Sequence, residues 1–385
     1  METSDSPRKR AFLVAFGGLA AMAAIMGVGR FVYTPILPVM VEALGLTQAQ
    51  AGLIASANYL GYLAGALAAM LNLPAGKRSL FLGALFVSVA TTGLMAAVGG
   101  LPAFIGVRFV AGFASAFAFI FGASLVVERL AALNRTGIVW IFFAGIGLGI
   151  AASAAMVAGL NAQGFGWRAM WVASCVLSAL ALVVAVALTP AASGPAERQA
   201  APGARAQPGA LATIVVAYGL FGFGYVITAT FIVAIVRTTA EVRGLEPYVW
   251  AVVGLSAAPS VLVWNAVAGR IGPLRAFALG SLVEAVGVAA SVLWLTPAGI
   301  ILAAAALGGT FVGVTAVGLM AARLMTSGDP RRAVALMTVA FALGQIVGPF
   351  VAGYVYDRTG SFAPSSLAAV GALVAAAALA LAIRR

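Results

Sequence analysis

The stretch PAASGPAERQAAPGARAQPG, residues 190–209, divides the sequence into two parts of similar length. It contains four prolines and three glycines and no apolar run, a composition typical of a flexible linker. The chain on either side of it is strongly apolar. We therefore predict two structural halves, residues 11–189 and 210–385, preceded by a short polar tail at residues 1–10.

The composition places both halves in a membrane. Of 385 residues, 63% are hydrophobic and 8% are charged, whereas soluble proteins average about 25% charged residues. Apolar runs of 18 or more residues indicate membrane-spanning helices. We predict six spans in each half, at 11–41, 47–71, 79–98, 101–127, 136–160, 168–189, 210–236, 248–268, 274–295, 298–322, 333–356 and 362–383.

The cationic residues give this arrangement an orientation. Of the 22 Lys and Arg residues, 16 fall in loops on one side of the predicted membrane, four fall on the other side, and two lie within spans. Cytoplasmic loops carry an excess of Lys and Arg. We therefore expect a multi-pass protein of the cytoplasmic (inner) membrane with both termini cytoplasmic.

Several classes of function lack the residues they need. The sequence has no histidine and a single cysteine, Cys175, so it offers neither a nucleophile–histidine pair nor a thiolate and imidazole metal site. The net charge of +12 lies in short loops rather than on a soluble basic module, which argues against nucleic-acid binding. We expect no enzyme activity, no cofactor and no metal.

Weak internal similarity indicates a duplication. GVGRFVYTP (27–35) aligns with GFGYVITAT (222–230), and GIGLG (145–149) aligns with GQIVG (344–348). Two related six-helix halves with a binding site between them are a common plan of secondary transporters. In this alignment Tyr225 corresponds to Arg30.

Particular motifs strengthen this interpretation. RFVAG (108–112), GQIVGPFVAG (344–353) followed by DRTGSF, and GRFVYTPILPVM (29–40) resemble elements of the major facilitator superfamily (MFS), in its YbfB-like branch. The loop GALAAMLNLPAGKRS (65–79) departs from the superfamily in lacking its usual aspartate. The resemblance implies an all-α integral membrane protein with twelve transmembrane helices in two pseudo-symmetric halves, working by alternating access.

Two arginines lie inside predicted spans, Arg30 and Arg108. An arginine within a membrane span usually faces the bundle interior or a water-filled cavity, because its charge is costly in hydrocarbon. A guanidinium also matches the two oxygens of a carboxylate. Both are therefore predicted to bind an anion, although either could instead be structural, Arg108 in helix packing or gating.

Polar and aromatic residues at helical spacing complete the predicted binding site. A buried amide needs hydrogen-bond partners, which favours the amides as ligand contacts. The aromatic residues fit side-chain packing equally well. The predicted substrate-binding residues besides the two arginines are Asn58, Tyr59, Tyr62, Tyr225 and Gln345.

The remaining assignments concern coupling and movement. Glu284 is the acid nearest the middle of the membrane, so it is the candidate for proton coupling, with a purely structural role as the alternative. Small residues and proline at helix contacts allow close packing and bends. The predicted gating and packing residues are Gly112, Gly344, Gly348 and Pro349.

These features predict a secondary active transporter that moves a small organic anion, a carboxylate above all, with proton coupling left open. The alternative is an exporter of amphipathic drugs or metabolites, with both arginines structural. A membrane sensor without transport is a third reading, but it would need a soluble domain for its partner. The expected partners are the substrate, the lipid bilayer and protons, and we expect a monomer.

Overall fold

The computed structural model describes residues 7–71, 74–189, 208–326 and 331–383. Within these ranges every regular element is a helix. Most of the predicted linker, residues 190–207, and the first six residues of the predicted tail lie outside the described part. The predicted all-helical fold class is confirmed for these residues.

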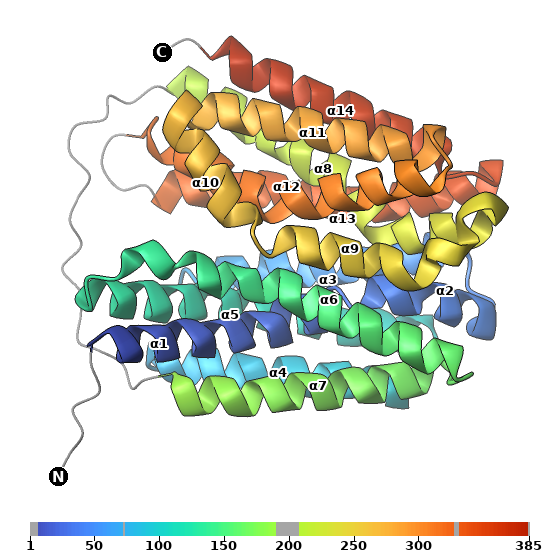
Figure 1. Ribbon diagram of the computed structural model, residues 1–385, viewed down its shortest axis with the longest axis horizontal. Coiled ribbons are helices and arrows are strands. Elements are labelled where there is room, and N and C mark those ends of the chain that lie inside the picture. The colour runs from blue at the N-terminus through green and yellow to red at the C-terminus, as the bar shows by residue number, and fades with distance from the viewer. Residues whose placement is uncertain (1–6, 72–73, 190–207, 327–330, 384–385) are drawn as a thin grey trace.

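The helices before the linker form one bundle and those after it form another (Figure 1). The first bundle consists of α1 (Pro7–Met22), η1 (Ala23–Arg30), α2 (Tyr33–Leu44), α3 (Gln48–Ala68), α4 (Lys77–Ala97), α5 (Leu101–Ala132), η2 (Thr136–Ile138), α6 (Trp140–Ala162) and α7 (Trp167–Leu188). The second consists of α8 (Pro208–Thr238), η3 (Ala240–Leu245), α9 (Glu246–Ala257), α10 (Ser260–Ile271), α11 (Pro273–Leu293), α12 (Pro297–Arg323), α13 (Arg331–Thr359) and α14 (Ala363–Ala382).

The described residues contain eleven helical stretches that are long and apolar enough to cross a membrane, and a twelfth if one bent pair counts as a single span. α1 begins and α14 ends at the same end of the molecule, at the left of Figure 1. α2 and η3 lie at the opposite end, which we call the far end.

The eighth span differs from the continuous helix predicted at 248–268. It consists of α9 and α10, and the two parts of this span are bent by 45° at residues 258–259. Proline lacks a backbone N–H and its ring clashes with the carbonyl four residues earlier, so Pro259 favours a kink or a break in the helix. α10 accordingly begins directly after it.

The first span is also irregular. Between α1 and α2 the chain forms the π-helical segment η1, which ends at Arg30. The backbone N–H of Phe31 donates to Met26, five residues earlier, at 3.2 Å, and the N–H of Thr34 donates to Phe31 at 3.3 Å. Pro35 and Pro38 follow inside α2 and lack N–H groups, so they remove two further backbone donors from the start of this helix. The helix is therefore broken beside Arg30.

The two bundles touch at backbone distance in two places. A Cβ atom built on Gly52 of α3 would lie 2.1 Å from the carbonyl oxygen of Pro349 in α13. A Cβ on Gly147 of α6 would lie 2.4 Å from the carbonyl oxygen of Gly254 in α9. Glycine is required at such contacts because any side chain would separate the helices.

Candidate functional site

Arg30 occupies the interior of the molecule, at the end of η1. Its side chain is 5% exposed. The guanidinium carbon lies over three aromatic rings, at 4.3 Å from the ring centre of Tyr62, 4.7 Å from that of Tyr59 and 5.6 Å from that of Phe31. These cation–π contacts stabilise a positive charge without neutralising it.

The edge of the Arg30 guanidinium, which carries its N–H donors, is poorly satisfied. Nη2 donates to Oε1 of Gln345 over 3.4 Å, a long hydrogen bond, and the buried Nε has no hydrogen-bond partner. Among the described residues no carboxylate lies within ion-pair distance of Arg30. The structure therefore leaves a buried cation with spare donor capacity and without a counter-ion.

Gln345 connects Arg30 to the second bundle. Its amide Nε2 donates to the hydroxyl oxygen of Tyr225, on α8. Tyr225 in turn packs nearly parallel to Phe311 and Phe341, with ring centres 5.8 and 5.6 Å away. The predicted residues Arg30, Tyr59, Tyr62, Gln345 and Tyr225 are thus brought together, with contributions from both bundles.

Arg108, on α5, has a different environment. Its Nη1 and Nη2 donate to the backbone carbonyl oxygens of Gly29 and Arg30, each over 2.9 Å. The break in the first span exposes these carbonyls, since Thr34 donates to Phe31 instead of to Arg30. The contacts of Arg108 favour a positioning role for this residue, which would hold the broken helix that carries Arg30.

Asn58 supports this arrangement from α3. Its side-chain Nδ2 donates to the backbone carbonyl of Arg108 over 3.0 Å, and its Oδ1 is buried without a hydrogen-bond partner. α3 and α5 approach closely here, since a Cβ atom on Gly112 would lie 1.9 Å from the carbonyl oxygen of Asn58. Asn58 therefore contacts the backbone of Arg108, the residue whose side chain bonds to the broken first span.

The other predicted packing residues lie where helices meet. Gly344 lies against the backbone of Gly219 on α8, and Gly348 lies against the side chain of Val226, also on α8. Pro349 lies within α13 and presents its carbonyl oxygen to Gly52. Through these contacts α13 packs against α8 of its own bundle and against α3 of the first bundle.

Glu284 is fully buried on α11 and contacts α12. The hydroxyl of Thr310 hydrogen-bonds to Oε2 of Glu284 and to the backbone carbonyl of Ala306, the latter over 2.7 Å, while Oε1 has no partner. Thr310 immediately precedes Phe311, which packs against both Tyr225 and Phe31. Glu284 is thus connected to the Arg30 site through two adjacent residues of α12.

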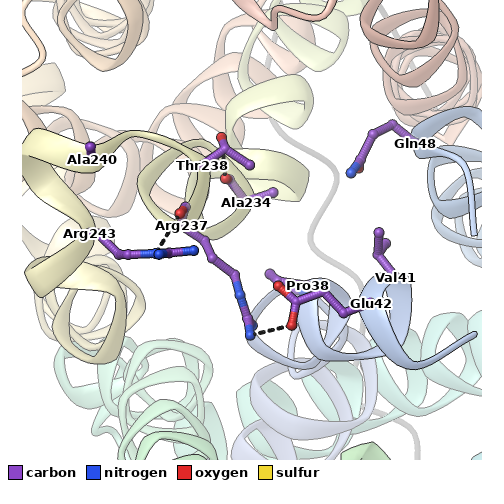
Figure 2. A pocket seen from close by; sticks show the side chains of 9 residues that line it. All are labelled: Pro38, Val41, Glu42, Gln48, Ala234, Arg237, Thr238, Ala240 and Arg243. Atoms are coloured by element: carbon purple, nitrogen blue, oxygen red, sulfur yellow. Dashed lines mark hydrogen bonds and ion pairs between the residues drawn. The ribbon is translucent and has the colours of Figure 1, made fainter. Parts of the chain in front are cut away.

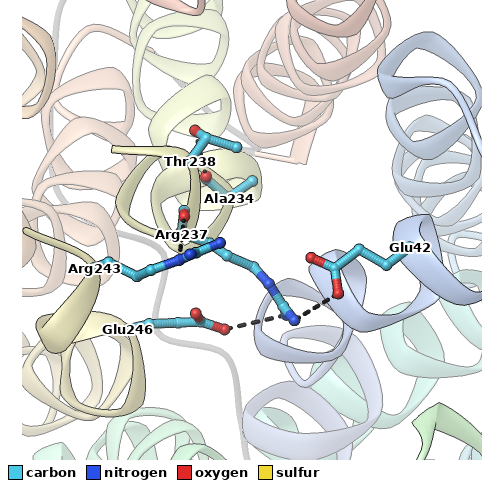
Figure 3. A network of polar contacts seen from close by, with 6 residues as sticks. All are labelled: Glu42, Ala234, Arg237, Thr238, Arg243 and Glu246. Atoms are coloured by element: carbon cyan, nitrogen blue, oxygen red, sulfur yellow. Dashed lines mark hydrogen bonds and ion pairs between the residues drawn. The ribbon is translucent and has the colours of Figure 1, made fainter. Parts of the chain in front are cut away.

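An ion-pair network joins the bundles at the far end. Arg237, at the end of α8, pairs with Glu42 of α2 over 2.7 Å and with Glu246 of α9 over 3.2 Å (Figure 3). Nε of Arg243 donates to the backbone carbonyl of Arg237 over 3.1 Å. Glu42 belongs to the first bundle and the other three to the second, so the Arg237–Glu42 pair crosses between them.

A second polar contact at the far end was not anticipated from the sequence. The carboxylate oxygens of Asp357, near the end of α13, accept hydrogen bonds of 2.9 Å from the backbone N–H groups of Gln48 and Ala49. Thr47 accepts from the N–H of Gln50 in a capping box. The T-x-x-Q sequence indicates the start of this helix, but nothing in the sequence indicates that Asp357 from the other half completes its cap.

A cavity of about 250 Å³ lies between these two contacts (Figure 2). None of the predicted substrate-binding residues lines it. It is therefore separate from the Arg30 site. Its lining residues are Pro38, Val41, Glu42, Gln48, Ala234, Arg237, Thr238, Ala240 and Arg243.

Comparison with known proteins gives a consistent result. A crystal structure of a mutant of the nucleoside transporter NupG is similar over 97% of this chain and 100% of that chain, with a TM-score of 0.74 and 14% sequence identity. At this identity the similarity establishes the fold alone. No curated protein matches the sequence. The family described as "Uncharacterised MFS-type transporter YbfB" matches residues 22–381, which is nearly the whole chain, and the protein therefore belongs to this family of MFS transporters.

Proposed function

We propose that this protein is a secondary active transporter that moves a small organic anion across the cytoplasmic membrane by alternating access, with Arg30 as the residue that binds the carboxylate. The observation that carries this proposal is the state of Arg30: it is 5% exposed, it has no carboxylate partner among the described residues, and its Nε has no hydrogen-bond partner. A buried charge without a partner is costly. A bound carboxylate would remove that cost.

The position of Arg30 between the bundles supports a transport cycle. Arg30 belongs to the first bundle, whereas Gln345 and Tyr225 belong to the second. A ligand that contacts all three would depend on how the bundles are placed relative to each other. Alternating access requires this dependence, because a ligand can shift a conformational equilibrium only through different interactions with the two states.

In this conformation the far end is the closed side of the transporter. Asp357, Arg237 and the backbone contact at Gly52 all join the bundles there. The distribution of Lys and Arg favours cytoplasmic termini, which makes the far end the outer face of the membrane. The structure then corresponds to a state closed to the outside, with Glu284 as the candidate for proton coupling.

A second function has one observation in its favour. The three rings around Arg30 already stabilise its charge, and these rings with Gln345 would also suit a neutral amphipathic or aromatic solute. In that case both arginines are structural and the protein is an exporter of such compounds.

Transport by purified protein in proteoliposomes separates the two functions. We expect uptake of labelled carboxylates by the wild type and its loss in Arg30→Ala and Arg30→Gln, with folding checked by gel filtration and thermal melting. The matched control is Arg168→Gln, a substitution of an exposed arginine whose guanidinium lies on Trp167 and which should leave uptake unchanged. Full carboxylate uptake by a folded Arg30→Gln protein would contradict the proposal, and efflux of dyes that is insensitive to this change would favour the exporter.

A further inference from the structure

We infer that the substrate is a monovalent carboxylate whose remaining body is a planar aromatic ring. This inference rests on the proposed function and narrows it to one chemical class. It follows from the charge that the site can neutralise, from the direction in which Arg30 presents its donors, and from the side chains that the rest of a ligand would meet.

Arg30 is the cation that the site makes available to a ligand. The side chains that contact Arg30 or continue from it, Gln345, Tyr225, Tyr59 and Tyr62, are all uncharged amides, phenols or rings. Arg108 is also buried, at 2% exposed, but both of its Nη atoms donate to backbone carbonyls.

The positive charge of Arg108 is stabilised by backbone carbonyl groups of the chain. The carbonyls that it binds, those of Gly29 and Arg30, form the C-terminal end of the helical segment α1–η1. The C-terminus of a helix carries a partial negative charge, which stabilises a cation placed there. The charge of Arg30 has no comparable partner. One negative charge on the ligand therefore balances the site, and a second would be buried without a partner.

The donors of Arg30 point along its edge. The guanidinium carbon lies within 5.6 Å of the ring centres of Tyr62, Tyr59 and Phe31, so aromatic rings surround the group. The free Nε and the weakly bonded Nη2 lie on the edge. Two neighbouring N–H groups on one edge match the two oxygens of a carboxylate in a bidentate contact.

The body of such a ligand would meet aromatic rings. Beyond Gln345, the ring of Tyr225 lies within 15° of parallel to that of Phe311 and within 16° of parallel to that of Phe341. Phe31 meets Phe311 edge-on, with ring centres 5.5 Å apart, and so links these rings to Arg30. A flat aromatic body stacks on aromatic surfaces of this kind.

A matched series of small molecules tests the inference on the full-length protein. The probes are benzoate, cyclohexanecarboxylate, terephthalate, benzamide and uridine, and binding is measured by calorimetry and by competition with uptake into proteoliposomes. Benzoate should bind at least about tenfold more tightly than the saturated acid, the dianion or the neutral amide. Arg30→Gln should abolish benzoate binding. Phe341→Leu, which removes one ring of the stacking surface, should reduce the preference for benzoate over cyclohexanecarboxylate to about twofold or less.

The outcomes distinguish this inference from the proposed function. Equal binding of benzoate and cyclohexanecarboxylate, or tighter binding of terephthalate, would overturn the inference and leave organic-anion transport intact. Absence of benzoate binding would overturn the inference as well. Binding of uridine or benzamide without binding of any carboxylate would overturn the proposed function too.

Discussion

Asp357 lies at the N-terminus of α3, where one of its carboxylate oxygens accepts a hydrogen bond of 2.9 Å from the backbone N–H of Gln48. The two residues belong to different bundles. The N-terminus of a helix carries a partial positive charge and unpaired N–H groups, so a carboxylate is stabilised there. This contact holds the bundles together at the far end, and it must break whenever the far end opens.

Replacing Asp357 with Asn should open the far end more often. The change keeps the shape of the side chain but removes its charge, which is worth about 0.3–1 kcal/mol at a helix N-terminus, or about two- to fivefold in population. The reporter is a cysteine in place of Thr34, a buried residue whose hydroxyl bonds to Ala229 across the bundles. Labelling by a membrane-impermeant maleimide, with Cys175 replaced by Ser, should become about two- to fivefold faster. An unchanged rate would show that the contact does not hold the closed state.

The two acids that pair with Arg237 should differ in importance. The side chain of Glu42 is 59% exposed and that of Glu246 is 18% exposed. Exposed ion pairs contribute about 0–1 kcal/mol, so Glu42→Gln should change the melting temperature little. Arg237→Gln should lower it more, because Glu246 then remains half-buried without this partner. Equal melting temperatures for the two variants would contradict this reading of the network.

Gly52→Ala should separate α3 from α13. The added Cβ would lie 2.1 Å from the carbonyl oxygen of Pro349, so one of the helices must move. Overpacking of this kind costs about 1–3 kcal/mol. The matched control is Gly83→Ala on α4, where the added Cβ has open space. We expect faster labelling of the Thr34→Cys reporter in Gly52→Ala alone, and the same rate in both variants would contradict the prediction.

Arg108→Lys should impair transport of every substrate by the same factor. Lysine has one nitrogen and cannot hold the carbonyls of Gly29 and Arg30 as the two Nη atoms do. Loss of a hydrogen bond to a charged group costs about 1.5–3 kcal/mol, so the melting temperature should fall. The maximal uptake rate should fall while the order of preference among substrates stays the same. A changed preference would instead place Arg108 in contact with the substrate.

Glu284→Gln should uncouple substrate movement from the proton gradient. The variant should lose accumulation driven by an imposed pH gradient but keep the exchange of labelled for unlabelled substrate, since its shape is preserved. The control is Ser281→Ala, one turn earlier on α11, whose hydroxyl bonds only to the carbonyl of Phe277 in the same helix. Gradient-driven accumulation by Glu284→Gln at the wild-type level would assign this acid a structural role.

The sequence was sufficient for the fold because the pattern that specifies it is long-range and apolar. Twelve runs of adequate length and a biased distribution of Lys and Arg determine how many spans there are. They do not determine where a span bends. Pro259 lies in the middle of an apolar run, so a hydropathy pattern continues through it although the helix does not. The π-helical turns before Arg30 were missed for the same reason.

The candidate site was predictable where it depends on side chains and unpredictable where it depends on backbone. Arg30 stands out in the sequence as a charge inside an apolar run, whereas Tyr62 and Gln345 stand out as polar or aromatic groups at helical spacing. The partners of Arg108 are two carbonyl groups that only a broken helix exposes. Asp357 was part of the quoted DRTGSF motif, yet its partners are also backbone groups.

The wide turns of η1 limit the changes of length that the first span can accept. A π-helical turn holds more residues than an α-helical one, so residues 23–30 contain surplus length relative to a straight helix. Deleting one residue from this segment would let the ladder close in the ordinary way, and α1 and α2 would keep their facing because the wide turn already contains the surplus residue. The carbonyls of Gly29 and Arg30 would then be bonded within the helix, and Arg108 would lose its partners. Proteins that retain both arginines should therefore also retain the full length of these eight positions.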